Sequence, residues 1–232
     1  MIMKRTVVFA AVLATTTMLH GQERKWHLEY EVGFKVSHFF NYPALSALQD
    51  GSEGYTGLTS AFSLGMSHVD GAYCGLRYEN TPLFTSNLAF DERAVLHNLS
   101  LVIGHSAMLT ENLELRFGTT LGLAILHNSF ASGGRNYSLN RYGFSGGLEV
   151  GLRYYVSESF FFHLNAGVDY VTGLSDVSGI PAGLPSQTHS TAASAHLGGG
   201  IGFGFRPKVK KLNMPAEVID RKEPLQMAWY GE

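Results

Sequence analysis

The stretch from Trp26 to Phe39, WHLEYEVGFKVSHF, alternates between apolar and polar side chains along its whole length. Large apolar residues occupy its even positions up to Val36, while His27, Glu31 and Lys35 are among its odd positions. A period of two indicates a β-strand with two unlike faces. The pattern predicts a strand, but a soluble sandwich, a lipocalin-like barrel and a membrane barrel all contain strands of this kind.

The same alternation recurs in seven further segments, and the lengths of the connections between segments follow a rule. The segments are 55–68, 72–80, 95–105, 113–127, 142–156, 160–171 and 193–206. Connections after the second, fourth and sixth segments are short, whereas those after the first, third, fifth and seventh are long and rich in Gly, Ser, Asn and Pro. This order predicts an all-β, eight-stranded, antiparallel up-and-down transmembrane barrel, with short periplasmic turns and long external loops.

Composition decides which face of each strand points outward. Charged residues make up 16% of the chain, well below the roughly 25% of soluble domains. If the apolar faces pointed inward, the water-facing surface would be poor in charge and would carry Gly198, Gly200, Gly202 and Gly204 in a row. A narrow eight-stranded barrel instead needs small residues inside. We therefore expect the apolar faces to point outward into hydrocarbon.

Amphipathic side chains near the predicted strand ends support this orientation. The aromatic ones expected on the outer face are Trp26, Tyr73, Tyr142, Tyr154, Phe160 and Phe205. The histidines expected beside them are His38, His68, His97, His105 and His127. Their spacing lacks the close grouping and carboxylate company of a metal site. We interpret them as girdles at the lipid headgroup level and expect neither metal nor cofactor.

The N-terminus has the layout of an export signal, with Lys4 and Arg5 before an apolar run and Gly21 before the expected cut. The predicted division is a signal peptide at 1–21, a barrel at 22–206 and a short polar periplasmic tail at 207–232. The mature chain would carry 15 basic and 19 acidic side chains. This balance gives no reason to expect a nucleic-acid partner. Cys74 is the only cysteine, so an internal disulfide is excluded.

These features together resemble the small eight-stranded outer-membrane barrels of Gram-negative bacteria, a superfamily with OmpX-like, OmpA-barrel-like, opacity-protein-like and PorT-like members. The resemblance covers residues 22–206 and includes a last strand, GGGIGFGF, with an aromatic end. It implies an outer-membrane location, contact with membrane lipid and lipopolysaccharide, and recognition of the last strand by the barrel-insertion machinery. The tail is too short for the peptidoglycan-binding domain of full OmpA-type proteins.

Charged side chains on the inward face are close to balanced, and we expect them to form an interior ionic network that plugs the lumen. Unpaired charges in a dry bore would each cost several kcal/mol, so acids and bases should interleave. The expected members are Glu29, Glu31, Lys35, Arg77, Glu79, Glu114, Arg116, Glu149, Arg153, Asp169 and His196. Lys35, Asp169 and His196 fall at similar heights on strands that become neighbours on closure, which predicts one cluster.

One pair of residues suggests an enzyme. His127 and Ser129 lie two apart on the outward face of one predicted strand, an arrangement similar to the His-x-Ser of lipid A deacylase barrels. In that family an Asn follows the Ser, and an acid on the next strand orients the His. Here Phe130 follows, and Glu149 on the next strand faces the lumen. A His–Ser pair without its orienting acid activates the hydroxyl poorly.

The sequence therefore predicts a non-enzymatic outer-membrane barrel with a plugged lumen and no catalytic, cofactor-binding or metal-binding residues. Its role would be structural, or a surface interaction through external loops whose charged residues include Arg135 and Arg141. Two alternatives remain open: a lipid A-modifying hydrolase using His127 and Ser129, and a periplasm-facing subunit of a secretion or envelope complex. A surface interaction through the loops would involve an unidentified extracellular protein. A subunit of an envelope complex would instead have a periplasmic partner.

Overall fold

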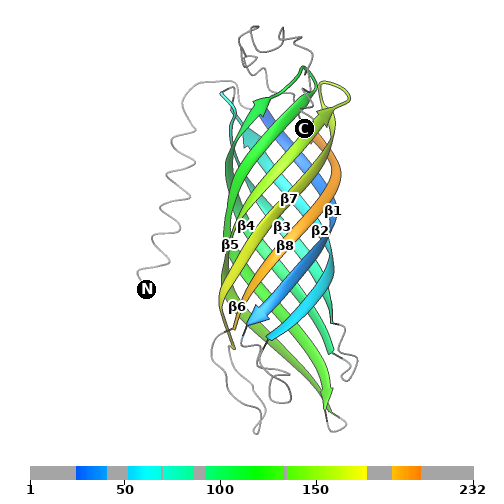
Figure 1. Ribbon diagram of the computed structural model, residues 1–232, viewed down its shortest axis with the longest axis vertical. Coiled ribbons are helices and arrows are strands. Elements are labelled where there is room, and N and C mark those ends of the chain that lie inside the picture. Colours follow the sequence, from blue (N-terminus) through cyan, green and yellow to red (C-terminus); the bar gives the residue numbers. More distant parts are fainter. Residues whose placement is uncertain are drawn as a thin grey trace, which may run out of the picture.

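In the computed structural model, eight strands form one closed barrel in which every strand is antiparallel to both neighbours (Figure 1). β1 closes the barrel against β8, and the pairing runs from His27 opposite Gly204 to Phe40 opposite Thr191. The structure describes residues 25–40, 52–68, 70–85, 92–132, 135–176 and 190–204. The strands are β1 Lys25–Phe40, β2 Ser52–Ser67, β3 Ala72–Thr85, β4 Glu92–Met108, β5 Leu113–Ser132, β6 Arg135–Tyr155, β7 Phe160–Asp176 and β8 Ser190–Gly204. The predicted fold class is confirmed.

The outer surface of the barrel is apolar on all eight strands. On β1, Trp26 and Phe34 are about half exposed, at 56% and 49%, while Glu29 and Lys35 are buried at 5% and 1%. Every backbone group of a closed sheet finds its partner within the sheet, so an apolar exterior of this kind suits a hydrocarbon surrounding. No helix long and apolar enough to cross a membrane occurs among the described residues.

Several strands are longer than the alternation predicts, most of all in the hairpin of β5 and β6. These strands have 20 and 21 residues, about twice the 9–11 that span a membrane. The stretch 128–141, expected as a long loop, is mostly strand, paired from Asn128 opposite Leu139 to Ser132 opposite Arg135. In Figure 1 this green hairpin extends beyond the other strands at the lower end. The alternation did not predict this part of the hairpin because its residues are mostly polar. A strand that extends beyond the hydrocarbon needs no apolar face.

The third strand is also longer than its predicted segment, which ends at Asn80. The strand continues to Thr85, and Pro82 lies opposite Val95 of β4. On the edge of β3 that faces β2, Leu58 and Thr59 of β2 have no register partner. Such a gap is expected beside a proline, which has no N–H to donate. The barrel tolerates the proline by interrupting one ladder for two residues.

We call the end of the barrel at which β1, β3, β5 and β7 end the long-loop end, and the opposite end, at which β2, β4, β6 and β8 end, the short-turn end. The predicted signal at 1–21 and the tail at 207–232 lie outside the described residues, as does Phe205.

Candidate functional site

The lumen nearest the short-turn end is organised around Glu29. This carboxylate accepts a hydrogen bond from Arg153 and one of 3.1 Å from Nη1 of Arg116. Arg153 also lies 3.5 Å from Oε2 of Glu114, to which the Tyr155 hydroxyl donates at 2.6 Å. These residues come from β1, β5 and β6. The side chains therefore cross the bore and tie opposite walls together.

Aromatic rings support both guanidinium groups. Arg116 lies over the ring of Tyr73, 3.7 Å from its centroid, and Arg153 lies over Phe161 at 4.6 Å. A cation over an aromatic ring contributes about 0.5–1 kcal/mol at exposed sites and about 2 kcal/mol when water is excluded. Tyr73 was expected on the outer face, and this prediction is wrong: the side chain is 1% exposed and points into the lumen. Its odd position beside Gly75 and Arg77 was the available signal.

The middle of the lumen is organised around Arg77. Its guanidinium donates to Glu31 at 2.9 Å and to Glu149 at 3.3 Å, and Asn165 donates a further hydrogen bond to Glu31. Nδ1 of His163 lies 3.7 Å from Glu31 and 3.9 Å from Glu29, which joins this group to the one around Glu29.

Further along the bore, Lys35, Asp169 and His196 lie together, as their positions on neighbouring strands predict. Lys35 Nζ bonds to Glu79 and lies 3.1 Å from Asp169 Oδ2, and Nδ1 of His196 lies 3.2 Å from the same oxygen. Arg77 comes within 3.8 Å of Glu79. The eleven charged or titratable residues singled out from the sequence form one connected set only together with His163, which was not singled out. We call this set of twelve residues the ionic network.

Glycines make room for these long side chains. A Cβ on Gly202 would meet the Phe161 ring, one on Gly198 would meet the Glu31 carboxylate, and one on Gly200 would meet both His163 and the backbone of β1. The glycine row of β8 is therefore a set of spaces beneath side chains from neighbouring strands. A cavity of about 20 Å³ is lined by Arg116 and Glu149, a volume that suits a single water molecule.

The lumen changes character towards the long-loop end, and the sequence analysis missed this change. A layer of hydroxyl and amide pairs comes first, such as Ser37 with Ser194 at 2.9 Å and Ser145 with Asn98 at 2.7 Å. Beyond it, buried apolar side chains form a cluster that we call the apolar cap. Its members are Phe39, Tyr55, Leu83, Ala94, Leu96, Ala124, Leu126, Val171, Leu174 and Ala192.

Arg141 also needs correction, because it was counted among the external loops. It lies on β6 and is 1% exposed, with its side chain inside the barrel. The available signal for the apolar cap was a local loss of alternation, and for Arg141 it was the odd position that it shares with the inward Glu149 and Arg153. Phe39–Phe40 and Leu83–Phe84 are apolar on both faces, as strands buried on both faces are.

On the outer surface, His127 and Ser129 occupy neighbouring outward positions of β5. Nδ1 of His127 lies 2.6 Å from Oδ1 of Asn140, which is its register partner on β6. The partner of His127 on β6 is thus an amide, where the family pattern has an acid. His97 makes a similar bond to the Tyr78 hydroxyl at 2.8 Å. Within the described ranges, no three His, Cys, Asp or Glu side chains are placed to hold a metal ion.

Comparison with solved structures places this geometry among known folds. Neisserial surface protein A matches with a TM-score of 0.50 and 14% identity, over 78% of this chain and 99% of that protein. The outer membrane protein AlkL, determined in lipid bilayers, matches with a TM-score of 0.51 and 14% identity, over 81% of this chain and 92% of that one. This chain has the fold of a small outer-membrane β-barrel.

The outer-membrane protease OmpT of Escherichia coli also matches, with a TM-score of 0.42 and 9% identity, over 78% of this chain and 96% of OmpT. No protein-family model and no curated protein sequence matches the chain.

Proposed function

We propose that this protein is a non-enzymatic outer-membrane barrel that is closed to solutes and acts through its long-loop end, either by contacting a partner outside the cell or by stiffening the envelope. The observation that carries this proposal is the filled lumen, where the ionic network and the apolar cap follow one another along the bore. Eight-stranded barrels have an interior just wide enough for side chains, whereas aqueous channels need about 16–18 strands.

Planar-bilayer recording tests the closed lumen. Purified protein should give no stable conductance steps above the empty-membrane control, because charges from β1, β3, β5, β6 and β7 bridge the bore. Regular open-channel currents that depend on the protein would refute the plug.

The long-loop end is favoured as the interacting end because the β5–β6 hairpin carries the wall beyond the other strands. Pull-down from intact envelopes, with the full chain and with a chain that lacks 207–232, separates this proposal from a periplasm-facing role. Partners retained by both chains and lost when 128–140 is shortened support the long-loop end. Partners lost with the tail support the periplasmic alternative.

The hydrogen bond that Nδ1–H of His127 donates to Oδ1 of Asn140 favours a second candidate, a lipid A-modifying hydrolase. In such an enzyme Ser129 would attack an acyl ester, His127 would accept the hydroxyl proton through Nε2, and Asn140 would orient the ring. A neutral amide fixes the ring but stabilises an imidazolium less than a carboxylate does, which makes this the weaker candidate. Mass spectrometry of lipid A from cells carrying the protein or its Ser129→Ala variant decides between them. Equal acylation in both removes the hydrolase.

A further inference from the structure

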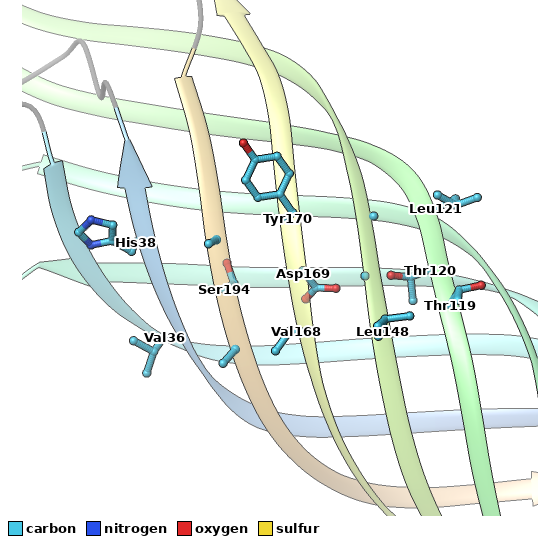
Figure 2. A pocket seen from close by; sticks show the side chains of 14 residues that line it. Val36, His38, Thr119, Thr120, Leu121, Leu148, Val168, Asp169, Tyr170 and Ser194 are labelled. Atoms are coloured by element: carbon cyan, nitrogen blue, oxygen red, sulfur yellow. The ribbon is translucent and has the colours of Figure 1, made fainter.

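Two spaces at the wall of the barrel differ in what lines them. Figure 2 shows the first, a hollow of about 950 Å³ that crosses the outer surface from β5 to β8 and β1. Its exposed side chains, such as Leu121 and Leu148, are hydrocarbon, so lipid of any kind fills it. The second is the cavity of about 20 Å³ on the lumen side, which is lined by Glu29, Arg116 and Glu149 among others. Charged groups surround this cavity, and its occupant has to match them.

The Tyr73 hydroxyl lies at the cavity, and it has no hydrogen-bond partner within the described protein. Its ring is held beneath the Arg116 guanidinium. Gly104 and Gly118 leave the space that the hydroxyl occupies, because a Cβ on either glycine would collide with it. The same Cβ on Gly118 would lie 3.2 Å from Oε1 of Glu149. The two oxygens therefore face one spot, although no hydrogen bond joins them directly.

A second buried donor belongs to the same cavity. Arg116 donates from Nη1 to Glu29 at 3.1 Å, but its Nε–H has no hydrogen-bond partner among the residues that the structure describes. An acceptor is at hand in Glu149, whose Oε2 accepts from Nη1 of Arg77 at 3.3 Å and whose Oε1 can accept further hydrogen bonds. Buried polar groups in folded proteins are almost always satisfied, either by protein or by ordered water.

The chemistry of these groups decides what fits. The Nε–H of Arg116 can only donate and a carboxylate can only accept, so the occupant must both accept and donate hydrogen bonds. An anion would face Glu29 and Glu149, and a cation would face Arg77 and Arg116. An extra charge buried there would be costly in either case. The small volume admits one water molecule, which is neutral and can both donate and accept.

We propose that this cavity is a binding site for one water molecule, which accepts hydrogen bonds from Arg116 Nε and the Tyr73 hydroxyl and donates one to Oε1 of Glu149. Three partners are the usual number for a buried water. Arg116 belongs to the group around Glu29, and Glu149 belongs to the group around Arg77. The water gives the ionic network a second connection between these groups, beside the imidazole contacts already described.

A crystal structure of the full chain, at a resolution that shows ordered water, tests the site. The crystals are soaked in sodium bromide, because bromide gives an anomalous signal and water does not. We expect one density peak within about 3.2 Å of Tyr73 Oη, Arg116 Nε and Glu149 Oε1, without anomalous signal. In Tyr73→Phe the water loses one of its partners, and its occupancy should fall at least about twofold. Tyr155→Phe is the control and should keep the peak, because the Tyr155 hydroxyl donates directly to Glu114.

Three results overturn the proposal: a bromide peak in the cavity, a direct hydrogen bond between Tyr73 and Glu149 with no peak between them, or an unchanged peak in Tyr73→Phe. X-ray footprinting in heavy-oxygen water gives a second measurement on the protein in lipid vesicles, because radiolysis of a bound water oxidises the side chains that it touches. Tyr73 should be labelled at least about fivefold faster than Tyr55, which is equally buried but lies in the apolar cap. Equal labelling rates would also overturn the site.

Discussion

The two parts of the lumen close the same bore by different means. The ionic network relies on partners from opposite walls, so that Glu29 of β1 meets Arg116 of β5 and Arg153 of β6. The apolar cap relies on volume alone, with side chains such as Phe39 and Leu126 at 0% exposure. Charge pairing demands particular partners, whereas apolar packing demands only the right size and shape.

This difference predicts unequal tolerance to substitution. In the ionic network the loss of one side chain leaves the charges that faced it buried without a partner. In the apolar cap the loss of one side chain leaves a void that its neighbours partly fill. The glycines beneath the network add a further constraint, because Gly202 leaves space for Phe161, which in turn supports Arg153.

The largest effect is expected for Glu29→Ala. This change removes the carboxylate between Arg116 and Arg153 and leaves buried positive charge without its main partner. Breaking a buried pair in this way costs about 3–5 kcal/mol of unfolding free energy. Urea titration of the protein in lipid vesicles measures the loss. Glu158→Ala, in the exposed turn between β6 and β7, is the control and should change stability by less than about 0.5 kcal/mol.

A double variant sharpens this test. Removing Arg116 together with Glu29 takes away one of the charges that Glu29→Ala leaves unpaired. The loss of unfolding free energy in the double variant should therefore be smaller than the sum of the losses in the two single variants. Strict additivity would show that the two side chains do not interact, and the description of the network would then be wrong at its centre.

An intermediate effect is expected for Leu126→Ala in the apolar cap. Leu126 is 0% exposed, and a buried Leu→Ala change costs about 2–5 kcal/mol, depending on how far the void collapses. The matched control is Leu121→Ala on the same strand, where the side chain is 63% exposed on the outer face and lipid can fill the space. In bilayer recordings the Leu126→Ala barrel should stay closed, because the ionic network still spans the bore. Conductance in this variant would make the apolar cap the true barrier.

The contrast also explains what the sequence could reveal. Period-two alternation predicted eight strands and placed Glu29, Arg77 and Asp169 on the inward face, because parity along a strand fixes the side of each residue. It could not say which charges meet across the bore, since the pairing of Arg153 with Glu29 depends on strand tilt and side-chain reach. The apolar cap escaped because alternation vanishes where both faces are apolar, as at Phe39 and Phe40.

The hydrogen bond between His127 and Asn140 shows a related limit. The two residues lie 13 apart in the chain, and their contact follows from the register of a hairpin that the sequence analysis took for a loop. Once β5 and β6 are extended to Ser132 and Arg135, the pairing places the two side chains opposite each other on the outer face. The loop-like composition of 128–141 gave no indication of these strand ends, so the contact between His127 and Asn140 could not be predicted either.

The smallest effect comes from two tyrosines of the ionic network, and it separates pairing from filling within that region. The Tyr155 hydroxyl donates to Glu114 at 2.6 Å, whereas the buried Tyr73 hydroxyl has no hydrogen-bond partner within the described protein. Tyr155→Phe should therefore cost about 1.5–3 kcal/mol, as a hydrogen bond to a charged group does, and Tyr73→Phe about 1 kcal/mol or less. Both variants keep the ring, so the packing of Tyr73 against Arg116 is preserved. Equal losses in urea titration would mean that the lumen depends on ring volume at both positions, and the distinction drawn between the ionic network and the apolar cap would lose its physical basis.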